Sequence, residues 1–396
     1  MQRALKVLAV VLPLVLVIPV LSGFRKSHEL NRGTLTIGYG NNLSGFLAVH
    51  DHLISDGARL AVAQINAKGG IGGKVKIKLD LEDTKTDLAA SVQVANDFVG
   101  KKVRLMVLPC NTDFQEAMAQ VAARHDLLTI SPCNGDPTVP RRYPIYWPVG
   151  MAGNAQGAQL ASYAKSKGYK RAWVLDSRQQ LYVHLMAKYF QKAAPSRGIT
   201  VSHVEDVPFG QTGFPSDYSA IVTKIKQANP QPDVIMTGIF TPFVDFFIKQ
   251  LRQSGIRTPV IGTDGMDTTN LTKTGGAAVN GTAFTTFGYP SRGSATARFY
   301  AAWQRRYHSR PDGSFVALGY DSIKVIEAAV RKAGSSDPKL IAAALKNGLT
   351  VDGSLGPIRF LGANRHNPTN LVAVVQVRNG KFVQVLKSVP KNIPSP

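Results

Sequence analysis

The stretch VRLMVLPCNTDFQEAMAQVAARHDLLTISPCNGDPTV (Val103–Val139) has the pattern of a strand, a helix and a second strand. Two apolar runs, Val103–Leu108 and Leu127–Ile130, lead into Pro-Cys-Asn, as buried strands that end in polar loops do. Between them, four apolar residues recur at helical spacing: Phe114, Met118, Val121 and Ala122. Because a helical crossover joins strands that point the same way, the stretch predicts the parallel sheet of an α/β protein.

The two loops that follow these strands form the first candidate binding site. Parallel strands end at the same edge of a sheet, so Asn111 and Thr112 should lie beside Asn134 and Gly135. That edge is where open α/β proteins bind ligands. Backbone N–H groups, a hydroxyl and amide dipoles suit a small anion such as a carboxylate. The alternative is that these residues only cap the helices that follow them.

The first residues of the chain have the pattern of an export signal. Arg3 and Lys6 precede an uncharged, largely apolar run, Val7–Phe24. The sequence has Phe24 where a lipoprotein cleavage box requires cysteine, so lipid anchoring is not expected. About 18 apolar residues is also near the lower limit for a membrane-spanning helix, so an uncleaved anchor is the alternative. Both interpretations place the body of the protein outside the cytoplasm, most simply in the periplasm.

The chain has two cysteines, Cys110 and Cys133, at matching positions after the two strands. Adjacent parallel strands lie about 4.8 Å apart, within the range that a disulfide can bridge. In an exported chain this placement favours a Cys110–Cys133 disulfide. The alternative is a pair of buried free thiols.

The composition is that of a folded protein with large cores. The chain has 396 residues, of which 44% are hydrophobic and 18% charged, which argues against disorder. Lys and Arg outnumber Asp and Glu, 47 to 25, for a formal net charge of +22. The basic residues are scattered and form no basic helix or known nucleic-acid module, so no nucleic-acid partner is expected. A solvated basic surface, drawn to an anionic membrane, is the interpretation we favour.

Strand and helix patterns alternate along the rest of the chain. Before the opening stretch, strand 34–39, a helix with Asp56 near its start, strand 75–81 and helix 88–99 predict one doubly wound lobe. After an interruption at 143–150, further alternation predicts a second lobe. Its elements are helix 154–167, strand 171–175, helix 181–194, strand 200–205, helix 216–228, strand 234–237, helix 242–254 and strand 260–262.

Beyond that lobe, 284–287 and 356–360 resemble extended crossings, with helices near 294–307 and 317–333 between them. Asn379-Gly380 predicts a hairpin turn between tail strands 371–377 and 382–385.

The segment GARLAVAQINAKGGIGGKVKI (57–77) resembles the signature of the branched-chain amino-acid-binding (Leu/Ile/Val-type) family of periplasmic solute-binding proteins of ABC transporters. The resemblance runs from about Thr34 to Val385. It implies a type I periplasmic-binding-protein fold with two doubly wound lobes, a three-crossing hinge and a solute trapped by lobe closure. The expected units are 1–33 as signal peptide or N-terminal anchor plus linker, 34–148 with 288–357 as lobe I, and 149–287 with 358–396 as lobe II. It further implies a small-molecule solute, membrane permease components as partners and a monomer.

The resemblance also assigns roles to single residues. Asn111, Thr112, Asn134 and Gly135 match the loops that hold the ligand carboxylate, and Asp264 matches the acidic residue that pairs with the ligand ammonium. Three further positions belong to the walls of the pocket: Phe46 and His50 in the first lobe and Phe240 in the second.

Tyr182 corresponds to a tyrosine of the second lobe after a one-residue shift, since direct alignment places Leu181 there. Some members also have a disulfide between strand ends, in which Cys110 fits one position but Lys85 lies near the other, so Cys133 is a different partner. The alternatives are purely structural roles: core packing for Tyr182 and Phe240, a rim position for His50 and a turn position for Asp264.

These observations favour a receptor for a small carboxylate, most simply an amino acid, over an enzyme. The sequence has no metal-spaced His/Cys cluster, no GxSxG elbow and no phosphate-binding glycine loop. We therefore expect no catalytic residues, no metal and no cofactor. A receptor for an aromatic acid, amide or urea is the alternative, because Asn111 and Phe240 lack the hydroxyl found at those family positions.

Overall fold

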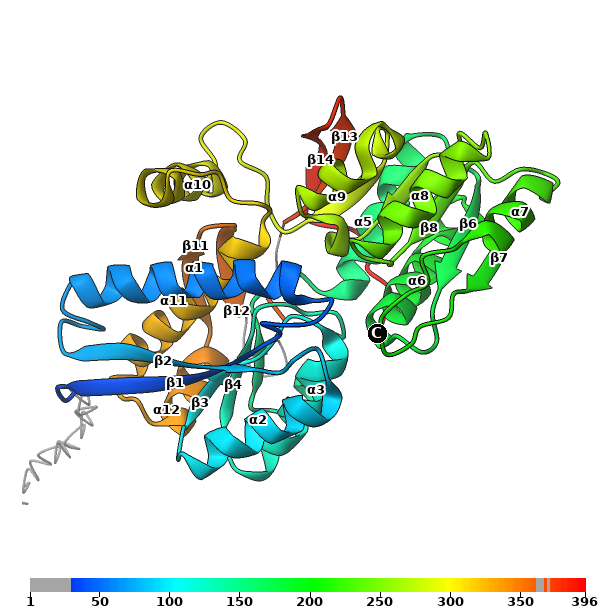
Figure 1. Cartoon of the computed structure of the whole chain (residues 1–396). Coiled ribbons are helices and arrows are strands. Elements are labelled where there is room, and N and C mark those ends of the chain that lie inside the picture. Colours follow the sequence, from blue (N-terminus) through cyan, green and yellow to red (C-terminus); the bar gives the residue numbers. More distant parts are fainter. Residues whose placement is uncertain (1–29, 361–366, 369–370) are drawn as a thin grey trace, which may run out of the picture.

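The computed structural model describes residues 30–360, 367–368 and 371–396, and these form two α/β lobes that meet face to face (Figure 1). The first lobe has a parallel sheet in the order β2-β1-β3-β4-β5. Its strands are β1 (Gly33–Asn41), β2 (Val75–Asp83), β3 (Leu105–Val107), β4 (Leu128–Ser131) and β5 (Tyr146–Pro148). The helices between them are α1 (Ala48–Ala67), α2 (Leu88–Gly100), α3 (Thr112–Arg124) and α4 (Val139–Arg142).

The second lobe has a seven-stranded sheet in the order β14-β13-β10-β9-β8-β6-β7. Its strands are β6 (Arg171–Asp176), β7 (Thr200–Asp206), β8 (Val234–Thr237), β9 (Val260–Gly262), β10 (Ala283–Thr286), β13 (Val372–Arg378) and β14 (Lys381–Ser388). Its helices are α5 (Gly153–Ser166), α6 (Leu181–Ala193), η1 (Pro195–Arg197), α7 (Ser219–Gln227), α8 (Phe243–Gln253), η2 (Asp264–Met266), α9 (Asn270–Gly275) and η3 (Gly276–Val279).

The central strands of both sheets are short and buried, and helices cover both faces of the sheets. All residues of β3, β8 and β9 are buried, as expected for parallel strands covered on both sides. The predicted type I fold with two doubly wound lobes is therefore confirmed. The tail hairpin is confirmed as well, because β13 and β14 pair antiparallel on either side of Asn379 and Gly380, both of which have positive φ.

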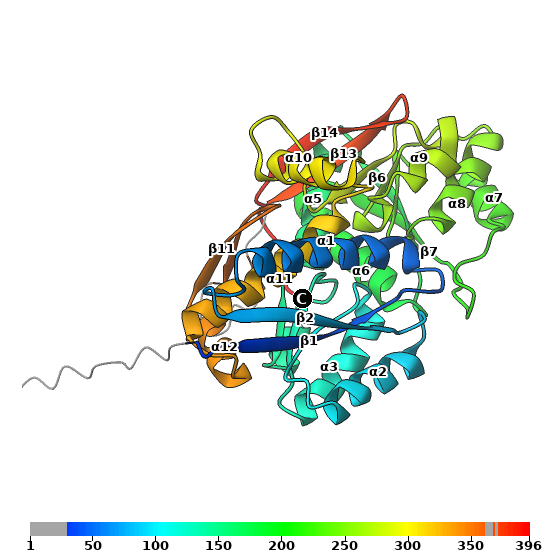
Figure 2. The ribbon, with the colours of Figure 1, turned by 60° about the vertical axis from the view of Figure 1, so that its left-hand side comes forward.

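Helices from the later part of the chain return to the first lobe. They are α10 (Ala295–Tyr307), α11 (Phe315–Ala333) and α12 (Pro338–Lys346), and α11 lies along α1 in both views (Figures 1 and 2). Two glycines allow this close approach: an added Cβ at Gly57 would be 1.8 Å from the Val316 carbonyl oxygen, and one at Gly319 would be 1.7 Å from that of Ile54.

The chain therefore passes between the lobes after β5, after β10 and again between β12 (Gly356–Phe360) and β13. In the last passage, residues 361–366 and 369–370 lie outside the described part of the chain, as does the predicted export segment Val7–Phe24. Among the residues that are described, no helix is long and apolar enough to cross a membrane. The exact lobe limits given above stay a prediction.

Three local expectations were wrong. Helix α1 begins at Ala48 rather than near Asp56, because its polar first turns are buried by contacts from other parts of the chain. The segment 356–360 is not a crossing strand but pairs with β11 (Leu349–Gly353) in a two-stranded sheet. Residues 146–148, taken as an interruption, are the edge strand β5, whose aromatic residues are buried.

Candidate functional site

The loop after β3 has both a cap and an unpaired hydroxyl. Asn111 caps α3, since its Oδ1 accepts a hydrogen bond from the Asp113 backbone N–H at 3.0 Å. Thr112, the first helical residue, is buried, and its Oγ1 has no hydrogen-bond partner among the described residues. The Asn111 side chain thus acts as a helix cap, as the alternative interpretation predicts. The Thr112 hydroxyl, in contrast, remains available to a ligand.

The loop after β4 lies directly against this hydroxyl. An added Cβ at Gly135 would be 2.1 Å from Thr112 Oγ1 and 3.3 Å from Tyr182 Cδ2, so these residues meet only because position 135 is glycine. The Asn134 amide nitrogen donates to Asn367 Oδ1 at 2.8 Å, while its buried Oδ1 is unpaired within the described ranges. Buried polar atoms without partners are costly, so this corner suits a polar ligand group.

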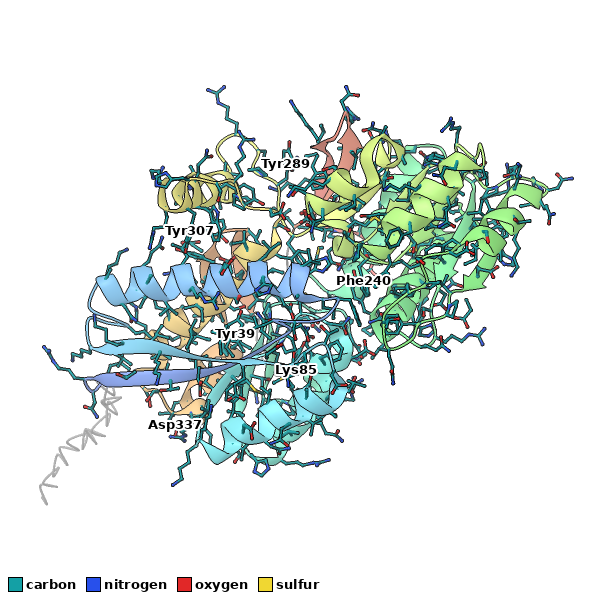
Figure 3. All side chains as sticks on the ribbon, viewed as in Figure 1. Tyr39, Lys85, Phe240, Tyr289, Tyr307 and Asp337 are labelled. Atoms are coloured by element: carbon teal, nitrogen blue, oxygen red, sulfur yellow. A yellow bond between two sulfur atoms is a disulfide. The ribbon has the colours of Figure 1, made fainter. Side chains whose placement is uncertain are left out.

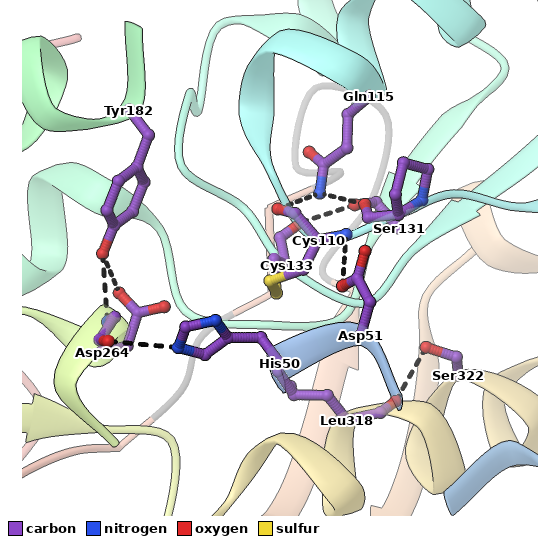
Figure 4. Close-up of a disulfide and its surroundings, with 12 residues drawn as sticks. His50, Asp51, Cys110, Gln115, Ser131, Cys133, Tyr182, Asp264, Leu318 and Ser322 are labelled. Atoms are coloured by element: carbon purple, nitrogen blue, oxygen red, sulfur yellow. Dashed lines mark hydrogen bonds between the residues drawn. A yellow bond between two sulfur atoms is a disulfide. The ribbon is translucent and has the colours of Figure 1, made fainter. Parts of the chain in front are cut away.

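A disulfide joins Cys110 to Cys133 and ties the two loops together, with a Cα–Cα distance of 5.0 Å (Figure 4). The two strands are direct neighbours, in the register Val107 to Ile130. On one side Gln115 Nε2 donates to the Cys110 carbonyl at 2.7 Å, and on the other Ser131 Oγ donates to the Cys133 carbonyl at 2.6 Å. The bridge and these side chains hold both loops at the sheet edge.

We expect peptide mass spectrometry without reduction to recover Cys110 and Cys133 in one linked peptide pair. The bridge closes a loop with a sequence separation of 23 residues. Chain entropy then predicts that replacing both cysteines by serine lowers the free energy of unfolding by about 3 kcal/mol. Alkylation of both thiols in the native exported protein would contradict the pairing.

In the second lobe, Tyr182 and Asp264 form one buried unit. The Tyr182 hydroxyl donates to Asp264 Oδ1 at 2.7 Å and lies 2.7 Å from Thr263 Oγ1. Burial raises the pKa of Asp264 to about 6, and the hydrogen bonds from Tyr182 and Gln156 act in the opposite direction. The structure thus places the Tyr182 hydroxyl against the buried Asp264 carboxylate, while the ligand-binding role of both residues stays a prediction.

His50 crosses from the first lobe to the second. Its Nε2 lies 3.1 Å from the Gly265 carbonyl oxygen (Figure 4). Its ring meets Phe315 edge to face at a centroid distance of 4.9 Å. The side chain is 4% exposed, so the rim alternative is wrong. Burial lowers the pKa of His50 to about 4, so the imidazole is neutral at pH 7 and Nε2 donates the proton to the carbonyl.

Phe46 and Phe240 form an aromatic contact between the lobes. Their rings are stacked with a centroid distance of 6.3 Å, and Phe46 also meets Phe209 and Phe243 edge to face at 5.7 and 6.0 Å. Phe240 lies where the two lobes meet (Figure 3). These rings supply an apolar wall but no hydrogen-bond donor.

A cavity of about 40 Å³ lies between the lobes, where most of these side chains converge. Its lining consists of Leu47, His50, Asp51, Cys110, Asn111, Tyr182, Phe240, Asp264, Gly265 and Phe315. The other predicted ligand-binding residues, Phe46, Thr112, Asn134 and Gly135, are not part of this lining. Because solute pockets usually measure hundreds of Å³, a solute can enter only if the cavity widens.

Sequence reasoning missed four residues of the lining: Leu47, Asp51, Gly265 and Phe315. Asp51 is 1% exposed, and its carboxylate accepts hydrogen bonds from the Asn42 backbone at 3.0 Å and the Cys110 backbone at 3.3 Å. Burial raises its pKa to about 7. The buried His50-Asp51 pair in a helical pattern was the available signal, but the predicted helix began after it. Phe315 could not be found from the pattern around His50, because it lies 265 residues (315 − 50) further along the chain.

We expect His50 to make ligand binding sensitive to acid. Burial between the closed lobes lowers the pKa of His50 from about 6.5 to about 4. As the pH drops from 6.5 to 4, protonation favours an exposed imidazole, so closure of the lobes around His50 becomes less favourable. Asp51 and Asp264 also face the cavity with raised pKa values, so the comparison must be with His50→Gln, which keeps both carboxylates. Calorimetry across this range should show affinity falling more steeply in the wild type than in the variant. Parallel slopes would contradict the assignment.

Two α/β lobes with polar loops and aromatic side chains facing each other across a buried cavity define a two-lobed solute-binding protein. The chain belongs to the periplasmic binding protein family, whose profile matches residues 34–381. Proteins of this family are binding proteins rather than enzymes and act outside the cytoplasm. Membership supports the predicted relation to ABC transporters and to their permeases.

Relatives and solved structures agree with this assignment. A Leu/Ile/Val-binding protein of Rhizobium johnstonii is 28% identical over 336 residues, which cover 84% of this chain and 88% of the relative. The leucine binding protein LivK of Thermotoga maritima has a TM-score of 0.82 at 25% identity, covering 90% of this chain and 99% of that one. A Rhodopseudomonas palustris solute binding protein in complex with benzoate has a TM-score of 0.79 at 20% identity, with coverage of 90% and 97%.

Proposed function

We propose that the chain binds an amino acid with an apolar side chain between its two lobes and presents it to the permease of an ABC importer. The observation that carries this proposal is the Tyr182–Asp264 unit, a buried carboxylate at the cavity with a tyrosine hydroxyl bound to it. A buried carboxylate is stabilised by a ligand cation, so an ammonium group suits it.

The first lobe supplies the complementary end of the site. The unpaired Thr112 hydroxyl and the start of α3 are suited to the ligand carboxylate, and Gly135 leaves room beside them. Asn134 adds a polar wall. Phe46, His50 and Phe240 enclose the side chain between the lobes, which favours an apolar group. Leu/Ile/Val-binding relatives at 26–28% identity support this ligand class.

We further propose that the protein is a periplasmic monomer, exported by the segment Val7–Phe24 or held by it in the membrane. The proposed lobe limits are 34–148 with 288–357 and 149–287 with 358–396. The sheet membership of β1–β10, β13 and β14 and the return of α11 to the first lobe support these limits. The limit at 357/358 is the exception, because it falls within β12, which pairs with β11.

An aromatic acid is the second candidate ligand. Asn111 and Phe240 offer no hydroxyl where one was expected, and a protein of the same fold is described in complex with benzoate. The rings around Phe46 could enclose an aromatic ligand. Against this candidate, a benzoate has no cation for the buried Asp264 carboxylate. Calorimetry with leucine, isoleucine, valine, benzoate and urea separates the two: saturable binding of benzoate alone would overturn the amino-acid proposal.

We expect ligand binding to draw the lobes together, because the polar groups lie on both sides of the cavity and neither lobe encloses a solute alone. The contacts His50–Gly265 and Phe46–Phe240 show that the two lobes can approach closely beside the cavity. Small-angle scattering should show a smaller radius of gyration with ligand than without it. Identical values at saturation would rule out closure while leaving binding intact.

A further inference from the structure

A second concave site lies on the second lobe, at the sheet edge opposite the cavity. Its lining includes Tyr169 before β6, Arg257 before β9 and Asn280 before β10, which are the amino ends of parallel strands. Phe240 and Asp264 instead follow the carboxyl ends of β8 and β9. The depression measures about 730 Å³, and no part of the proposed amino-acid site contributes to it.

Three cations line this depression: Lys249, Arg252 and Arg257. The lining contains no Asp or Glu, and none of the three forms an ion pair among the described residues. Asp245, one turn before Lys249 in α8, is a carboxylate outside the lining that interacts electrostatically with Lys249. It is buried and accepts a hydrogen bond from the Thr274 hydroxyl. The three cations therefore face the depression without a counter-charge in its lining.

Arg252 is held in a fixed position at the end of α8. One guanidinium nitrogen, Nη1, donates to the carbonyl oxygens of Ile256 and Thr258, each at 3.0 Å. The side chain is half-buried, and burial together with the neighbouring Arg257 lowers its pKa. Lys249 and Arg252 are partly buried and Arg257 is exposed, so an anion bound beside them would offset the repulsion between Arg252 and Arg257.

Neutral donors complete the depression. The Asn280 Oδ1 accepts the Gly380 N–H at 3.1 Å, so its amide nitrogen is the part left to donate. Tyr169 adds a hydroxyl. A guanidinium fork, an ammonium, an amide and a hydroxyl around one concave surface match the several oxygens of a phosphate group better than a single carboxylate.

We propose that Lys249, Arg252 and Arg257 form a binding site for a phosphate-bearing anion, on the opposite edge of the lobe from the amino-acid cavity. The volume exceeds that of one phosphate, so a diphosphate or a phosphate attached to a larger group fits the chemistry. The overall charge of +22 raises the local anion concentration but is not specific, so the test must separate this site from the general charge.

The test uses calorimetry with inorganic pyrophosphate at constant ionic strength, on the full chain and on two variants of equal charge. Lys249→Gln/Arg257→Gln removes two cations of the site and leaves the Arg252 contacts intact. Lys226→Gln/Lys346→Gln removes two exposed cations from other helices. We expect saturable binding that weakens about tenfold or more in the site variant and less than about twofold in the control. Equal losses, or no saturable binding by the wild type, would overturn the proposal.

Two further arms identify the source of the phosphate group and keep this site separate from the proposed function. Vesicles of phosphatidylcholine with phosphatidic acid should bind the wild type, in competition with pyrophosphate, if the ligand is a lipid headgroup; binding of free pyrophosphate alone indicates a soluble anion. Amino-acid affinity should be the same in the wild type and the site variant. A loss of amino-acid binding in that variant would show that the two sites are not independent and would contradict this assignment.

Discussion

Asp264→Asn is expected to weaken amino-acid binding by about ten- to a hundredfold, the equivalent of about 1.5–3 kcal/mol for a lost charge-assisted hydrogen bond. In the structure this carboxylate is 4% exposed and receives the Tyr182 hydroxyl at 2.7 Å. The amide has nearly the same shape and can still accept that hydrogen bond, but it carries no charge for an ammonium group. The loss should therefore fall on ligand binding and scarcely on folding.

Calorimetry and thermal melting on the same samples measure the two effects separately. Asp217→Asn is the matched control, because it removes the same charge from an exposed position in the same lobe. An acid without an amine, such as benzoate, should bind Asp264→Asn at least as well as the wild type, since the buried charge is gone. Unchanged amino-acid affinity in Asp264→Asn would leave the carboxylate a structural role and favour the aromatic-acid alternative.

Gly135→Ala is expected to weaken ligand binding by about the same factor as Asp264→Asn, but through a steric clash rather than the loss of a charge. The added Cβ would be 2.1 Å from Thr112 Oγ1, closer than any real contact, so the hydroxyl must move. Overpacking of this kind costs about 1–3 kcal/mol. The clash also displaces the Thr112 hydroxyl, which is the group proposed to hold the ligand carboxylate. We expect a lower Tm together with weaker binding.

A double-mutant cycle distinguishes displacement of the hydroxyl from damage to the loop. Thr112→Ala removes the hydroxyl and should itself weaken binding, while the pair Thr112→Ala/Gly135→Ala should be little worse than Thr112→Ala alone. Gly210→Ala is a control at a glycine of the same protein where an added Cβ meets nothing within 4 Å. Additive losses in the cycle would show that Gly135 acts independently of Thr112.

Much of the architecture could be predicted from local pattern. The alternation of apolar runs with helical periods placed most strands and helices of both lobes within a few residues, because buried parallel strands and amphipathic helices leave different periodicities. The two loops after β3 and β4, and the cysteines in them, followed from one strand-helix-strand unit. Neighbouring parallel strands bring such loops together whatever the rest of the chain does.

The site depended on contacts that no local pattern contains. Helix α1 starts about two turns earlier than its periodicity indicates, because Asp51 is buried by loops from β1 and β3 and His50 by the second lobe. Phe315 reaches the cavity only because α11 returns to pack on α1 through Gly57 and Gly319. Residue types and spacing by themselves determined the lobes, the polar loops and the paired cysteines. Only the tertiary structure decided which polar groups are buried together, because burial depends on surfaces that distant segments bring to one another.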